Sequence, residues 1–141
     1  MWLSKSPSGP AFKFLIENIS LMDELKLSGN CLKFSRPLLS FDASFDDPEQ
    51  PYLNLMKELL SHMFNTPKYH PKSKPFIDHI ISFKFFEDKI WFRNYQVLNQ
   101  NEEQFTEKDD PDKLVLIEIG PRFSMNPIKA FQGSMGGEAL W

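Results

Sequence analysis

Several stretches of the chain alternate hydrophobic and polar side chains with a period of two, the pattern of a strand with one buried face. This alternation predicts strands over residues 13–19, 37–41, 77–85 and 90–97. Glu87 and Asp88 separate the last two and suit a tight turn, so we expect an antiparallel hairpin there. Residues 114–119 are nearly all apolar, which predicts a further strand in the centre of the sheet.

One segment has the three- and four-residue spacing of an amphipathic helix. The acidic pair Asp46-Asp47 before Pro48 predicts its start, because proline in the first turn loses no hydrogen bond. Asn65-Thr66-Pro67 predicts its end. The apolar positions that form its buried stripe are Leu53, Met56, Leu59, Leu60, Met63 and Phe64.

Two shorter helices are predicted from their end residues. Residues 21–27 are expected to form a helix that ends at Gly29-Asn30 with a glycine C-cap. Asn126-Pro127 predicts the start of a last helix, which carries Ile128 and Phe131 and stops at Gly133. Strands and helices in this order predict a layered α/β or α+β domain.

The composition is that of one globular domain with many aromatic rings. Fourteen phenylalanines in 141 residues imply an aromatic core, or aromatic surface kept for a partner. We therefore treat residues 1–141 as one domain and the acidic residues 99–113 as a flexible loop. No apolar run approaches the roughly 18 residues of a membrane helix. The single cysteine, Cys31, excludes an internal disulfide and favours a reducing compartment.

The formal net charge of −3 argues against binding nucleic acid through bulk charge. Contact with phosphates would need a local basic patch. Such a patch is predicted at Lys68, His70, Lys72 and Lys74, which are interleaved with Tyr69 and three prolines that stiffen the chain. A solvated lysine loop is the simpler interpretation of the same residues.

Trp91, Arg93 and Tyr95 lie on one face of the predicted strand over residues 90–97. Aromatic rings and arginine side by side on a sheet suit stacking with unpaired bases. They suit packing beneath a helix equally well, with the guanidinium reaching the edge of the core.

Signs of catalysis are weak. The glycines of residues 133–137 lack the lysine of a phosphate-binding loop and follow a predicted helix instead of preceding one. His62, His70 and His79 have no metal-ligand spacing, and Asp78 and His79 are adjacent in a strand and so point to opposite faces. We therefore expect no catalytic residue, no metal site and no cofactor.

Several segments resemble, in order, the Brix domain of ribosome-biogenesis factors. The matching segments are residues 2–10, 22–26, 29–33, 72–79, 90–96, 117–123 and 131–137. The resemblance implies an α/β fold of two similar halves, related to anticodon-binding domains, here one half with a mixed sheet covered by helices. It also implies a nucleolar, non-catalytic protein that binds ribosomal RNA in large-subunit precursors beside other assembly factors.

The chain departs from the family pattern in places. The first half of the family's domain and its basic C-terminal tail are expected to be missing. Phe34 stands where the family pattern has glycine, and Pro127 and Ala130 stand where larger aliphatic residues are usual in the last helix. Loss of the first half is expected to leave an unpaired sheet edge and an exposed apolar face.

The candidate phosphate contacts are Lys72, Lys74, Arg93, Arg122 and Lys129. Arg122 and Lys129 flank the start of the predicted last helix, whose N-terminus would favour an anion. An ion pair between Arg122 and Glu118 is the alternative for that arginine. Two other functions stay open: a protein–protein scaffold that docks on another assembly factor without touching RNA, and a shortened copy that has lost the family function.

Overall fold

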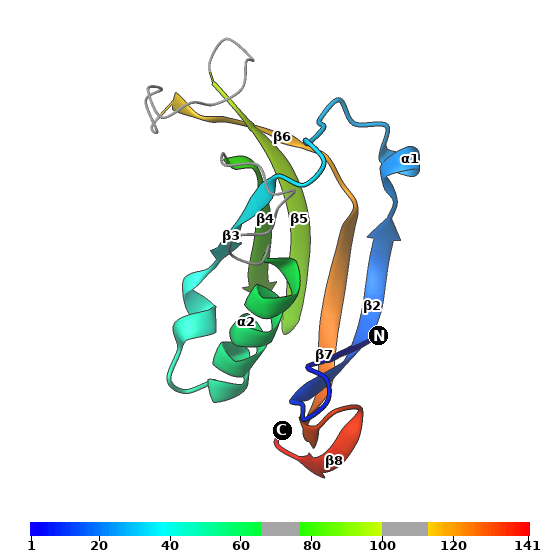
Figure 1. Cartoon of the computed structure of the whole chain (residues 1–141), viewed down its shortest axis with the longest axis vertical. Helices are drawn as coiled ribbons and strands as arrows, with labels where there is room; N and C mark the ends of the chain where they lie inside the picture. The colour runs from blue at the N-terminus through cyan, green and yellow to red at the C-terminus, as the bar shows by residue number, and fades with distance from the viewer. Residues whose placement is uncertain (66–76, 100–112) are drawn as a thin grey trace.

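The computed structural model describes residues 1–65, 77–99 and 113–141. Its body is an eight-stranded mixed sheet with the strand order β1-β2-β7-β5-β4-β3, in which β6 pairs with β5 and β8 with β7 (Figure 1). All described pairings are antiparallel except that of β3 with β4. The strands are β1 (Trp2–Ser4), β2 (Ala11–Ser20), β3 (Arg36–Phe41), β4 (Ile77–Phe86), β5 (Lys89–Leu98), β6 (Val115–Glu118), β7 (Arg122–Gly133) and β8 (Gly136–Ala139).

Helix α2 (Pro51–Phe64) and a short 3-10 helix (Ala43–Asp46) cover one face of this sheet, and the sheet curls around α2 (Figure 1). The four-residue helix α1 (Met22–Leu25) has no buried residue and lies beyond the end of β2. The predicted layered α/β fold with a mixed sheet is therefore confirmed. No helix among the described residues is both long enough and apolar enough to span a membrane.

Aromatic rings fill the space between α2 and the sheet. Phe83 is almost fully buried and lies 4.9 Å from Phe41, 5.5 Å from Phe64 and 5.6 Å from Phe92, measured between ring centroids. Phe92 also stacks on Phe123 at 4.4 Å. Offset-stacked and edge-on rings at these distances attract one another in addition to burying area. The core is therefore aromatic, as the phenylalanine count suggested.

The hairpin of β4 and β5 is confirmed. Glu87 and Asp88 have φ of 53° and 59°, and positive φ at both central residues is the conformation of a type I′ turn. A two-residue turn fixes the pairing of the whole hairpin, which runs from Phe86 opposite Lys89 to His79 opposite Gln96.

The predicted helix after Asn126 is wrong, because residues 122–133 form the long strand β7. Pro127 misled the prediction: proline suits the first turn of a helix, but it is also tolerated at a bulge in a strand. The register of β7 with β2 shifts between Lys13 and Phe14, which pair with Lys129 and Pro127. The extra residue breaks the period-two pattern and so hides the strand in the sequence.

The other predicted boundaries need smaller corrections. The strand over 114–119 shortens to β6, which pairs only with β5 among the described strands and so is not central. The first helix ends at Leu25, where Lys26 with φ of 48° takes the C-cap role predicted for Gly29.

Helix α2 begins at Pro51 and not near Pro48, and its Met63, predicted to be buried, is exposed. The predicted end at Asn65 is confirmed. The acidic loop predicted for residues 99–113 lies almost wholly outside the described residues.

Buried polar contacts hold residues 29–35 against β4, β5 and β6. The Asp78 carboxylate accepts a hydrogen bond from the Leu32 amide, and the Ser35 hydroxyl lies 3.0 Å from His79 Nδ1. A Cβ on Gly29 would lie 2.6 Å from the carbonyl oxygen of Glu118. Only glycine permits this close approach to β6.

Phe34 lies in this segment with φ of 67°, a left-handed conformation that disfavours side chains with a Cβ. We expect Phe34→Gly to raise the free energy of unfolding by about 0.5–1 kcal/mol, since glycine adopts this φ without strain. Urea denaturation measures the change. Phe86→Gly, at an exposed phenylalanine without positive φ, is the control and should not stabilise. A less stable Phe34→Gly protein would mean that ring contacts outweigh the strain.

Burial lowers the pKa of His79 below its ordinary value of 6.5, against an opposing effect of Asp78. The unfolded chain therefore binds more protons than the folded one just below pH 6.5, so stability is full above that pH and falls as the pH drops toward the folded-state pKa. We expect His79→Asn, which keeps a donor for Ser35, to remove this part of the acid sensitivity. Unfolding midpoints measured between about pH 7.5 and 5.5 test this prediction, and His62→Asn, at an exposed histidine, is the control. If the midpoint depends equally on pH in the wild type and in His79→Asn, the prediction is wrong.

Candidate nucleic-acid interface

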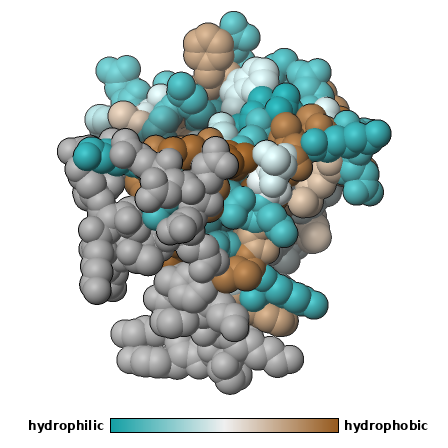
Figure 2. Space-filling model, turned by 90° about the horizontal axis from the view of Figure 1, so that it is seen from above, coloured by the Kyte–Doolittle hydropathy of each residue, from teal (hydrophilic) through white to brown (hydrophobic). Residues whose placement is uncertain are grey.

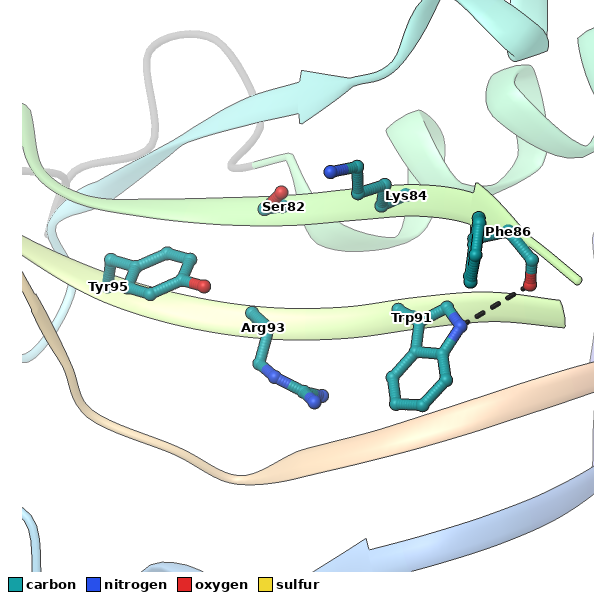
Figure 3. Close-up of a pocket in the computed structure, with 6 residues that line it drawn as sticks. All are labelled: Ser82, Lys84, Phe86, Trp91, Arg93 and Tyr95. Carbon is teal, nitrogen blue, oxygen red and sulfur yellow. Dashed lines mark hydrogen bonds between the residues drawn. The ribbon is translucent and has the colours of Figure 1, made fainter.

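The sheet has a second face, which points away from α2. On β4 and β5 this face carries the side chains that alternate with the buried rings, and they line a groove of about 380 Å³ (Figure 3). The lining residues are Ser82, Lys84, Phe86, Trp91, Arg93 and Tyr95. Trp91, Arg93 and Tyr95 thus share one face, as predicted. The alternative that they pack beneath a helix is not met among the described residues, because α2 lies on the opposite face.

The groove combines cations with flat aromatic surface. The Arg93 guanidinium lies 5.4 Å from the centre of the Trp91 ring, and its Nη1 donates to the Phe92 carbonyl at 2.8 Å. Trp91 Nε1 donates to the Phe86 carbonyl at 3.4 Å (Figure 3). These contacts fix the indole and the guanidinium without covering the groove. Lys84 is exposed and directly opposite Trp91 in the hairpin.

Two arginines share one carboxylate beside the groove. Arg122 donates to both oxygens of Glu118, from Nε at 2.9 Å and from Nη2 at 2.7 Å, and Arg93 Nε lies 3.8 Å from the same carboxylate. The predicted alternative for Arg122, an ion pair with Glu118, is therefore present. Two positive groups and one negative group leave this cluster with a net positive charge. An arriving phosphate would compete with Glu118 for the arginines.

Of the remaining predicted contacts, only Lys129 is among the described residues, and it does not join this cluster. Lys129 lies further along β7, opposite Lys13 of β2. Lys72 and Lys74 lie outside the described residues. The helix N-terminus expected between Arg122 and Lys129 does not exist, because both are in β7. Of the five candidates, the described structure brings together only Arg93 and Arg122.

Lys84 and Phe86 were missed as site residues, although the sequence contains the information that places them. A two-residue turn at Glu87-Asp88 makes Lys84 face Trp91, since the pairing follows from the turn length alone. Ser82 faces Arg93 for the same reason. What the sequence does not reveal is which face of the hairpin the helix covers.

The described residues hold no cluster of three or more metal-ligating side chains. Ser35 and His79 are in contact, but the Ser35 hydroxyl donates to the Leu32 carbonyl at 2.8 Å. Its single hydrogen is thereby used, so His79 Nδ1 is the donor toward Ser35. A nucleophilic serine needs the reverse arrangement. Glycines 133, 136 and 137 belong to the β7–β8 hairpin.

Apolar side chains are also exposed beside the polar ones at the α1 end of the molecule. Met22, Leu27, Leu32 and Phe34 are all more than a third exposed there. Figure 2 looks down on the molecule from above, and hydrophobic areas lie among hydrophilic ones in this view.

Comparison with known proteins gives a consistent family match. A family model described as the Brix domain matches residues 1–129. The ribosome biogenesis protein BRX1 homologs of Homo sapiens and Xenopus laevis are each 52% identical over 141 residues, which is all of this chain and 36% and 38% of theirs. The BRX1 homolog 2 of Arabidopsis thaliana is 49% identical over 142 residues, 44% of its length. The chain therefore spans less than half of the length of these relatives.

The shared carboxylate makes a prediction about stability. We expect Glu118→Gln to lower the free energy of unfolding by about 1 kcal/mol, because partly exposed ion pairs contribute little and the two arginines then repel. Urea denaturation at low and high salt measures it, and the loss should shrink as salt screens the repulsion. Asp46→Asn, which breaks the exposed pair with Lys57, is the control and should cost less. A loss above about 3 kcal/mol would show that the cluster behaves as a buried network.

Proposed function

The chain belongs to the Brix domain family, and from this premise we propose that it is a non-catalytic ribosome-biogenesis factor that binds ribosomal RNA in precursors of the large ribosomal subunit. The named relatives are ribosome biogenesis proteins, and the identity to them extends over the whole of this chain. A nucleolar location and contact with other assembly factors belong to the same proposal.

The observation that carries the RNA contact is the groove on the open sheet face. Its described lining holds two cations, Lys84 and Arg93, and three aromatic side chains, and it contains no carboxylate. Aromatic faces stack on unpaired bases of any sequence, and cations track the phosphates between them. A sheet with such side chains is a common platform for single-stranded RNA. Duplex RNA offers no free base faces to these rings.

The charge pattern favours attraction of RNA by local groups of cations over attraction by the net charge of the chain. The net charge of −3 gives no overall pull toward nucleic acid, so binding depends on where the cations gather. Arg93, in the groove, and Arg122, beside it, lie close together, with Glu118 holding them in place. Lys129, and Lys72 and Lys74 from the part of the chain that the structure does not describe, remain proposed phosphate contacts.

A protein-docking role is the second candidate, favoured by the exposure of Phe86, which leaves 59% of its surface open at the rim of the groove. A partner protein could cover this ring together with Trp91. The same variants separate the two roles, because RNA binding depends on salt and apolar docking does not.

The test is fluorescence anisotropy of a labelled single-stranded RNA of about a dozen nucleotides, beside a duplex of the same length. We expect Trp91→Ala to weaken single-strand binding about tenfold, since one stacked base contributes about 1–3 kcal/mol. Arg93→Gln should also weaken binding and reduce its salt dependence. In cells, the tagged chain should sediment with large-subunit precursors and be released as salt rises.

Lys57→Gln is the matched control, because Lys57 also lies over an aromatic ring, Phe41, at 5.8 Å, but on the α2 side of the sheet. It should bind RNA as the wild type does. Equal binding by wild type and Trp91→Ala would exclude the groove. Sedimentation with precursors that persists at high salt and is lost in Phe86→Ala would favour the docking role, and a chain found only at the top of the gradient would mean loss of the family function.

A further inference from the structure

A second group of aromatic rings and cations lies on the same outer face, at the other end of β7. Trp2 of β1 stacks on Phe131 of β7 with ring centroids 5.3 Å apart. Lys13 Nζ lies 5.7 Å from the Trp2 ring, and Lys129 Nζ lies 5.7 Å from the Phe131 ring. These four residues come from three adjacent strands and form what we call the lysine–aromatic cluster.

The strand register makes this cluster compact. Trp2 pairs with Lys13, and Lys13 pairs with Lys129, so the three side chains stand in one row across β1, β2 and β7. Their neighbours Phe12 and Ala130 are fully buried toward α2, which places the row on the outer face. The register shift that hid β7 in the sequence brings Lys129 to the face on which Lys13 lies.

Two lysines directly opposite each other on antiparallel strands repel. A carboxylate nearby would offset the repulsion, yet within the described part of the chain neither lysine takes part in an ion pair. The rings hold each ammonium by cation–π attraction of about 0.5–1 kcal/mol at such exposed sites. The cluster thus keeps two oriented positive charges side by side, with no ion-pair partner among the described residues.

We propose that the lysine–aromatic cluster binds a backbone phosphate of single-stranded RNA between Lys13 and Lys129, with a neighbouring base against the Trp2 and Phe131 rings. The proposal rests on the proposed function and extends it to a second contact on the same strand of RNA. Ser124 of β7 pairs with Trp91 beside the groove, so the two sites are roughly 15–20 Å apart along β7. A segment of a few nucleotides spans such a distance. Phosphate fits better than an acidic peptide, because only the nucleotide uses the planar rings beside the cations.

The experiment measures RNA affinity and its salt dependence for the 141-residue chain and for Lys13→Gln/Lys129→Gln. We expect the double variant to bind the labelled single strand about five- to tenfold more weakly. The slope of the logarithm of the binding constant against the logarithm of the salt concentration should fall in magnitude by about one. Lys5→Gln/Lys26→Gln removes the same charge from exposed positions outside both sites and is the matched control. It should bind nearly as the wild type does.

A stability readout separates ligand binding from a structural role. Neutralising the facing lysines removes their repulsion and also the cation–π attraction of each ammonium, so the unfolding midpoint should change little. A markedly lowered midpoint together with the RNA loss would assign the lysines to folding and overturn the proposal. RNA carrying 4-thiouridine should also form photo-cross-links to Trp2 or Phe131, which mapping by mass spectrometry detects.

The outcomes distinguish this proposal from the general function. If Lys13→Gln/Lys129→Gln binds RNA like the wild type while Trp91→Ala does not, the cluster is no RNA contact and the groove keeps its role. If the wild type binds no RNA, both proposals fall. If a polyglutamate peptide binds the wild type more tightly than RNA and loses binding in the double variant, the cluster is a protein-docking site.

Discussion

The packing of α2 against one face of the sheet is the interaction on which the rest of this structure depends. Phe83 is at its centre, in contact with rings from β3, β5 and α2. Side chains of a strand point alternately to its two faces, so burying Phe83 and Phe92 forces Lys84, Trp91 and Arg93 outward. The aromatic core and the candidate RNA-binding groove are thus two consequences of one alternation.

The outer face uses charge in two different ways. At the groove, Glu118 holds Arg93 and Arg122 in defined positions at the cost of part of their charge. At the lysine–aromatic cluster, rings take the place of the carboxylate and leave the full charge of Lys13 and Lys129. Both arrangements restrict cationic side chains before any ligand arrives, which lowers the entropy cost of binding. An acidic protein can in this way present positive charge locally.

The family match and the contacts of the described residues are separate kinds of evidence about this chain. The chain matches the Brix domain over residues 1–129 and spans less than half of the length of the named ribosome biogenesis proteins. Phe34 occupies a left-handed position, a backbone conformation that favours glycine. The segment around it is held by Asp78 and His79, whose buried contacts fasten residues 29–35 to the sheet.

The sequence by itself determined the elements whose pattern is local: the β4–β5 hairpin, its turn at Glu87-Asp88 and the buried stripe of α2. Turn length and side-chain periodicity act over a few residues, so both can be read from the chain directly. Tertiary structure alone decided that residues 122–133 form a strand, because a bulge against β2 shifts the alternation that would have revealed it. It also decided which face α2 covers, and hence that Trp91 and Arg93 stay open, and it set the register of β2 with β7 in which Lys13 meets Lys129. These choices depend on contacts between segments that are distant in the sequence, more than a hundred residues in the case of Lys13 and Lys129, and no local pattern encodes them.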